Sequence, residues 1–88
     1  MKSNKFYKEM LKIEERRFNL ISEEFSRLYI QKDILEHTSY VLAKERKINK
    51  FAIEKIEELI ETIEMVMSSL RVKKENINNK LVDLREKV

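Results

Sequence analysis

The chain contains neither glycine nor proline anywhere in its 88 residues. Turns that need a positive φ angle normally use glycine, and turns that need a fixed φ angle normally use proline. A chain that lacks both therefore has few tight turns and long uninterrupted elements. Hydrophobic residues make up 42% of the chain and charged residues 40%, a composition typical of amphipathic helices and coiled coils. The sequence predicts an all-α fold built from a few long helices.

Apolar residues recur every seven positions in the second half of the chain, which predicts a long amphipathic helix. The central row is Ile56, Ile63, Leu70, Ile77 and Leu84. A second apolar row flanks it at Ala52, Leu59 and Val66, and a third at Ile53, Ile60 and Met67. Contact with a single neighbouring helix needs only a narrow stripe. We expect the third row to face a helix of another protein chain.

The first half of the chain has its own seven-residue repeat. One stripe is formed by Leu11, Phe18, Phe25, Ile21, Leu28 and Leu35. A further apolar row, offset from this stripe, is formed by Phe6, Ile13, Leu20 and Ile34. This helix is therefore also apolar on more than one narrow face.

The two patterns are separated by the segment EHTSY at 36–40, where Thr38 or Ser39 is suited to cap a new helix. We expect a single domain over 1–88, with a first helix over about 3–36, a turn at 37–39 and a second helix over about 40–88. A short connection favours an antiparallel helical hairpin. The Ser- and Asn-rich stretch at 68–76 predicts a bend, with a short third helix over 77–88 as the alternative.

Two helices alone leave the offset apolar rows in water, and fully burying one such side chain is worth about 1.5–3 kcal/mol. The sequence therefore predicts a bundle completed by another chain. The partner is either a different helical protein or a second copy, which would give a homodimeric four-helix structural protein. The residues expected to contact the partner are Phe6, Ile13, Leu20, Ile53, Ile60 and Met67.

No catalytic or metal-binding pattern is visible in the sequence. His37 is the single histidine and the chain has no cysteine, whereas a zinc site normally needs three or four such ligands. We expect a non-enzymatic protein without cofactor, metal or small-molecule substrate. No stretch has the length and apolarity of a membrane span or of a signal peptide, which favours a cytoplasmic location.

Basic residues form two clusters, and these are the candidate phosphate contacts. The clusters are Lys44, Arg46, Lys47 and Lys50, and Arg71, Lys73 and Lys74. An acidic block over 54–64 separates them, whereas nucleic-acid-binding proteins usually present one continuous basic stripe. Nucleic-acid binding is therefore the weaker alternative to protein binding.

The sequence YIQKD places Tyr29 and Asp33 four residues apart, on one face of the expected helix. This spacing is similar to the Tyr- or Phe-x-x-x-Asp/Glu export motif of type VII secretion, although the chain has no Trp-X-Gly turn. In architecture the whole chain resembles the small α-helical partners of LXG-domain secretion substrates. The resemblance implies an adaptor or chaperone that presents a larger helical substrate and is exported with it without a cleaved signal peptide. Alternatives are a coiled-coil component or chaperone of flagellar or type III export, and a phage-type inhibitor.

Overall fold

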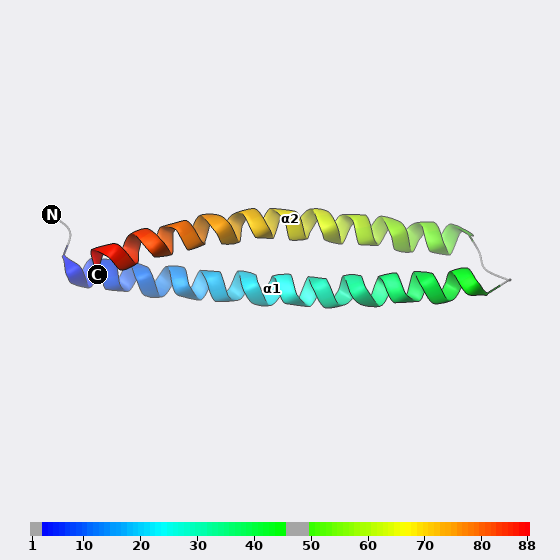
Figure 1. Cartoon of the computed structure of the whole chain (residues 1–88), viewed down its shortest axis with the longest axis horizontal. Helices are drawn as coiled ribbons and strands as arrows, with labels where there is room; N and C mark the ends of the chain where they lie inside the picture. Colours follow the sequence, from blue (N-terminus) through cyan, green and yellow to red (C-terminus); the bar gives the residue numbers. More distant parts are fainter. Residues whose placement is uncertain (1–2, 46–49) are drawn as a thin grey trace.

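The chain folds into two long helices that lie side by side. The computed structural model describes residues 3–45 and 50–88, which contain α1 (Asn4–Lys44) and α2 (Lys50–Lys87). The helices run antiparallel, so that the end of α2 returns to the beginning of α1 (Figure 1). The molecule is a rod of 69 × 14 × 13 Å. The predicted all-α antiparallel hairpin is confirmed.

Local interactions define both ends of α1. Ser3 is the N-cap, and its hydroxyl accepts a hydrogen bond from the backbone N–H of Phe6 at 3.3 Å. At the other end Lys44 lies in the last turn, where a positive charge interacts favourably with the helix dipole. The backbone of Glu45 is extended, and its N–H donates to the Leu42 carbonyl at 3.1 Å.

The connection between the helices lies later in the chain than the sequence pattern predicts. α1 continues through 37–39 to Lys44, so the expected turn at 37–39 is wrong. The Thr38 hydroxyl donates to the Ile34 carbonyl one turn earlier, at 2.8 Å, and is satisfied within the helix. With the connection near the middle of the chain, the helices contain 41 and 38 residues, and each has a partner along almost its full length.

One seam of inward-facing side chains joins the helices, with alternating spacings of three and four residues in each helix. Every seam residue is buried or half-buried. In α1 they are Tyr7, Leu11, Glu14, Phe18, Ile21, Phe25, Leu28, Lys32, Leu35, Ser39 and Leu42. In α2 they are Ile53, Ile56, Ile60, Ile63, Met67, Leu70, Lys74, Ile77, Leu81 and Leu84. This two-row spacing is that of an antiparallel coiled coil.

Three residues that were expected to contact a partner lie in the seam instead, so this prediction is wrong for them. Ile53 and Ile60 are half-buried and Met67 is 6% exposed, because their row faces α1. The row of Leu59 and Val66 is exposed instead. The row of Ile53 continues as Lys74, Leu81 and Val88, whereas the row of Leu59 continues as Lys73, Lys80 and Lys87. The row that stays more apolar along the helix is the one that is buried.

The last twelve residues are an integral part of the hairpin. α2 is continuous from Lys50 to Lys87, without the expected bend at 68–76 or a separate third helix over 77–88. Ile77 and Leu81 are 3% and 2% exposed and are among the most buried side chains described. Because the helices reverse near the middle of the chain, this segment packs on the beginning of α1 (Figure 1).

Candidate docking face

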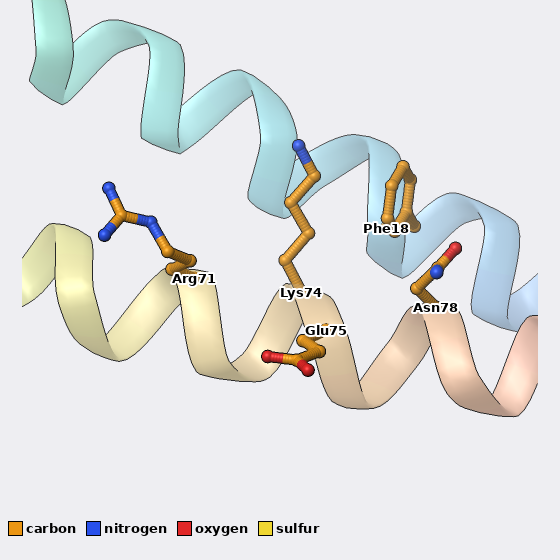
Figure 2. A pocket seen from close by; sticks show the side chains of 5 residues that line it. All are labelled: Phe18, Arg71, Lys74, Glu75 and Asn78. Carbon is orange, nitrogen blue, oxygen red and sulfur yellow. The ribbon is translucent and has the colours of Figure 1, made fainter.

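The hairpin has two long sides, one on each flank of the seam. On one side, called the Arg17 side, Arg17 lies with Lys73 and Lys80 around an open groove. On the opposite side, called the Glu15 side, Glu15 approaches Arg85 at 4.0 Å. A second hollow on the Glu15 side is lined by residues of both helices (Figure 2). These residues are Phe18, Arg71, Lys74, Glu75 and Asn78.

Seven-residue steps assign further residues to the Arg17 side, because such positions share one side of a coiled-coil helix. In α1, the steps from Arg17 lead to Glu24, which is paired with Arg27 at 3.0 Å, and then to Gln31 and Thr38. In α2, the steps back from Lys73 lead to Val66 and Leu59. Side chains three or four residues away on the outer flank of each helix border these rows.

A stretch of the Arg17 side, between Arg27 and Glu45 in α1 and between Lys55 and Lys73 in α2, carries no charged residue and is called the uncharged face. It consists of Gln31, Ile34, Thr38 and Val41 of α1 and Leu59, Thr62, Val66 and Ser69 of α2. All eight residues are exposed. In a chain in which 40% of residues are charged, an uncharged surface that spans three turns of both helices is unusual.

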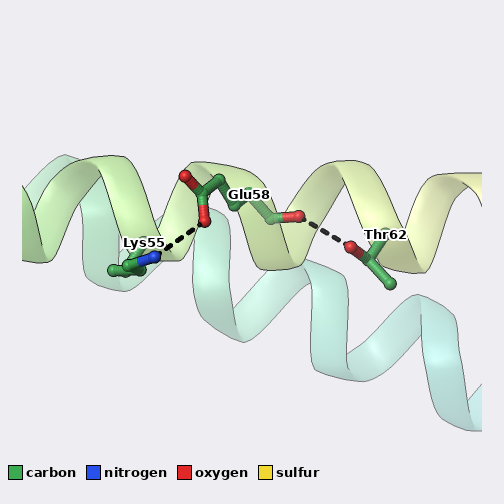
Figure 3. Close-up of polar contacts among 3 residues, drawn as sticks. All are labelled: Lys55, Glu58 and Thr62. Carbon is green, nitrogen blue, oxygen red and sulfur yellow. Dashed lines mark hydrogen bonds and ion pairs between the residues drawn. The ribbon is translucent and has the colours of Figure 1, made fainter.

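The threonine hydroxyls on this face are satisfied within their own helices. The Thr62 hydroxyl donates to the Glu58 carbonyl at 3.0 Å, as shown in Figure 3, and Thr38 bonds the Ile34 carbonyl in the same way. A threonine in this arrangement needs no further partner for its hydroxyl proton and adds a methyl group to the surface. The uncharged face can therefore be covered by an apolar surface at little cost in lost hydrogen bonds.

Four aliphatic side chains supply most of the apolar area of the uncharged face. Ile34 is 59% exposed, Val41 42%, Leu59 52% and Val66 44%. Ile30, Met65 and Val72 are also exposed and border it on the outer surfaces of the helices. Burying such side chains against another helix would be favourable by an amount roughly proportional to the area covered.

The Glu15 side is charged. Lys32 lies 3.2 Å from Glu64 and 3.6 Å from Glu36. The pKa of Lys32 lies above its ordinary value of 10.5, and the hydrogen bond to Glu64 is the largest cause. Desolvation of the amine lowers the pKa in part, and the charges of Glu64 and Glu36 raise it further. This side is therefore suited to solvent, whereas the uncharged face is suited to a protein partner.

The residues that were expected to contact a partner fall into two groups. Phe6, Ile13 and Leu20 are exposed on the outer surface of α1, in the same seven-residue row as Ile34 and Val41. The other three, from α2, lie in the seam, as described above. Leu59, Val66 and the two threonines were not predicted from the sequence. The signal for them is the lack of charge in their rows between 59 and 69.

The structure does not gather the candidate phosphate-binding residues on one surface. Arg71 and Lys74 lie on the Glu15 side, where they approach the rings of Phe25 and Phe18 at 5.6 and 5.2 Å. Lys73 lies on the opposite side. Lys44 lies over the ring of Tyr40 at 4.2 Å, and Lys50 begins α2. Arg46 and Lys47 lie outside the described residues.

Tyr29 and Asp33 are both exposed on α1. Tyr29 is 59% exposed and lies two seven-residue steps from Glu15, on the Glu15 side. The two residues are therefore away from the uncharged face.

Over 3–45 and 50–88, no group of three potential ligands is placed to hold a metal ion, and His37 is exposed. Neither helix, within the part of the chain that the structure describes, has an apolar stretch that could cross a membrane. Comparisons with known protein families, curated proteins and solved structures found no match. The surface of the hairpin is therefore the basis for any functional inference.

Proposed function

We propose that this chain is a non-enzymatic helical adaptor whose uncharged face packs against a helix of a larger protein. The observation that carries the proposal is the uncharged face itself, where both helices expose aliphatic side chains with no charge between them. A charged solvent-facing surface, as on the Glu15 side, would serve an isolated hairpin better. Beyond Arg27, the outward row of Phe6, Ile13 and Leu20 adds a separate apolar surface to α1 toward the other end of the rod.

The partner that fits the architecture best is the helical N-terminal domain of an LXG-type secretion substrate. In this proposal the hairpin binds the substrate in the cytoplasm and accompanies it to the export machinery. Tyr29 and Asp33 act as the export motif. Their location supports this role, because they remain accessible when the uncharged face is covered.

A matched pair of substitutions tests the docking face. Val66 and Val82 are exposed to a similar extent on α2, at 44% and 49%, and seven-residue steps assign them to opposite sides of the hairpin. Val66→Asp should abolish the complex with an LXG N-terminal domain, and Val82→Asp should leave it intact. Light scattering of the mixed proteins measures the complex, and circular dichroism confirms that both variants remain helical.

Two results would overturn the adaptor proposal. One is a monomer that binds no hydrophobic dye and forms no complex with any helical domain. The other is a tight homodimer that buries Val66 and leaves no surface for a second protein, because the chain would then be a four-helix structural protein.

A further inference from the structure

The groove on the Arg17 side is a second feature of the surface that carries the uncharged face. It is lined by Arg17, Ile21, Lys73, Asn76, Ile77 and Lys80. Within the described part of the chain, no ion pair involves Lys73 or Lys80. Arg17 is bonded to Glu14 at 3.0 Å, but its side chain is 54% exposed. Two lysines without an ion-pair partner and one accessible guanidinium therefore surround this groove.

The groove and the uncharged face are parts of one strip. Leu59, Val66, Lys73 and Lys80 occupy a single seven-residue row of α2. Seven residues of helix span about 10 Å, so the strip is about 30 Å long. Its half nearer the connection, at Leu59 and Val66, is uncharged. Its other half carries Arg17, Lys73 and Lys80, and the Glu24 carboxylate in the row of Arg17 is already paired with Arg27, so this half is basic on balance.

Resting on the proposed adaptor function, we propose that the strip binds an amphipathic helix of another protein whose apolar stripe continues into acidic residues. The apolar part of that helix covers Leu59 and Val66, and its carboxylates meet Arg17, Lys73 and Lys80. A helix of about 21–25 residues matches the length of the strip. The acidic end determines where along the rod the partner binds, because a shifted helix would place carboxylates against aliphatic side chains.

A second copy of this chain is a poorer occupant of the strip. The acidic residues of α2 include Glu57 and Glu64, and seven-residue steps place both in the row of Arg71 and Arg85, on the Glu15 side. In a symmetric dimer the same surface meets itself. The basic halves would then meet each other or the uncharged halves. The carboxylate of Glu24, in the row of Arg17, is already paired with Arg27 of its own chain at 3.0 Å.

Nucleic acid is also a poorer occupant. The cations occupy only half of the strip, and the other half would place aliphatic side chains against phosphates. A nucleic-acid site normally extends its positive charge along the whole contact.

Selection from a library of helical peptides tests the proposal. The peptides carry a fixed apolar stripe in one half and random residues at the corresponding positions of the other half, and they are selected on the immobilised full-length protein. We expect enrichment of Asp and Glu at the random positions. Selection on the Val66→Asp variant, run in parallel, identifies peptides that bind elsewhere.

The affinity of the best acidic peptide is then measured by fluorescence anisotropy on two charge-reversal variants. Lys73→Glu combined with Lys80→Glu should weaken binding at least tenfold and reduce its dependence on salt. Lys5→Glu combined with Lys12→Glu is the matched control, because these exposed lysines are also seven residues apart but lie on the opposite side. The control pair should change the affinity less than twofold.

The outcomes separate this inference from the adaptor proposal. Selected peptides without acidic enrichment, whose binding is lost in Val66→Asp, would overturn the acidic partner and keep the docking face. If no peptide is enriched on the original protein relative to the selection on Val66→Asp, both the acidic partner and the docking face are overturned. A dimer whose mass does not fall when peptide is added would also overturn the acidic-helix proposal. So would a 20-base-pair DNA duplex that binds through Lys73 and Lys80 more tightly than the peptide does.

Discussion

Glu14 is a carboxylate in the seam of the hairpin and is only 4% exposed. One of its oxygens, Oε1, accepts a hydrogen bond from Arg17 at 3.0 Å, whereas Oε2 is buried without a partner in the described structure. Burying a charge with incomplete hydrogen bonding costs free energy that an apolar side chain does not. Glu14 therefore contributes less to the stability of the hairpin than an apolar side chain would at the same position in the seam.

Replacing this carboxylate should stabilise the hairpin. We expect Glu14→Leu to raise the free energy of unfolding by about 1–4 kcal/mol, because leucine fits the heptad seam without a buried charge. Urea denaturation followed by circular dichroism measures the change. Glu23→Leu, at an exposed position of α1, is the control and should stay within about 0.5 kcal/mol of the original protein. A loss of stability in Glu14→Leu would show that the carboxylate is fully satisfied in solution.

Lys32 makes the stability of the hairpin depend on pH in the alkaline range. Its pKa in the folded protein lies above its ordinary value of 10.5, mainly through the hydrogen bond to Glu64. A raised pKa means that the folded state holds the proton more tightly than the unfolded state does. The stabilisation is therefore complete below about pH 10.5 and is lost as pH rises through the higher pKa of the folded protein.

A substitution isolates this effect. Lys32→Met removes the ammonium group, so its stability should fall less steeply above about pH 10.5 than that of the original protein. Thermal melts between neutral and alkaline pH give the two slopes. Lys12→Met serves for comparison, because it removes an exposed lysine that takes part in no ion pair of the described residues. Parallel pH curves for Lys32→Met and the original protein would contradict the role of the Lys32–Glu64 contact.

At the scale of the helices, the all-α hairpin could be predicted because two amphipathic patterns and the lack of Gly and Pro permit little else. The stripe of α1 was also predicted correctly, since Phe18 and Phe25 do lie in the seam. The position of the turn was not predictable from local signals. Thr38 can cap a new helix or bond back to the preceding turn, and only the packing of the whole hairpin decides between them.

The candidate docking face was missed for a related reason. Two apolar rows of α2 compete for the seam between Ala52 and Leu70, and only the residues after Leu70 distinguish them. With the turn expected at 37–39, those residues had no partner on the first helix, so Leu81 and Val88 could not decide the choice. A connection near the middle of the chain pairs the whole of α2, and the row of Leu81 is then buried.

This choice of row can be tested with one kind of substitution at two positions. Leu81 is 2% exposed and Leu59 is 52% exposed, both on α2. Leu81→Ala should destabilise the hairpin by about 2–5 kcal/mol, because it removes buried methyl groups and leaves a cavity. Leu59→Ala should change stability by less than about 0.5 kcal/mol, since it truncates a solvent-facing side chain in a helix that tolerates alanine. Equal effects, measured by urea denaturation, would show that the seam uses a different row.

At the scale of the whole molecule, a rod 14 Å by 13 Å in cross-section has a single seam and no central core. Most residues of α1 and α2 are exposed, and on the Arg17 side part of the exposed surface is aliphatic. A third helix on the uncharged face would convert the seam into a core enclosed on more sides. The hairpin should therefore gain stability when its partner binds.

Thermal unfolding with and without a partner measures this gain. A ligand that binds only the folded state, present at 100 times its Kd, adds about 2.7 kcal/mol to the free energy of unfolding. For a domain of this size each kcal/mol corresponds to about 4–8 °C in Tm. An LXG N-terminal domain at that excess should therefore raise the Tm of the hairpin and of Val82→Asp by more than about 10 °C. Val66→Asp should show no such rise, because a carboxylate in the uncharged face would have to be buried without a partner. A similar rise in both variants would place the binding surface elsewhere on the rod.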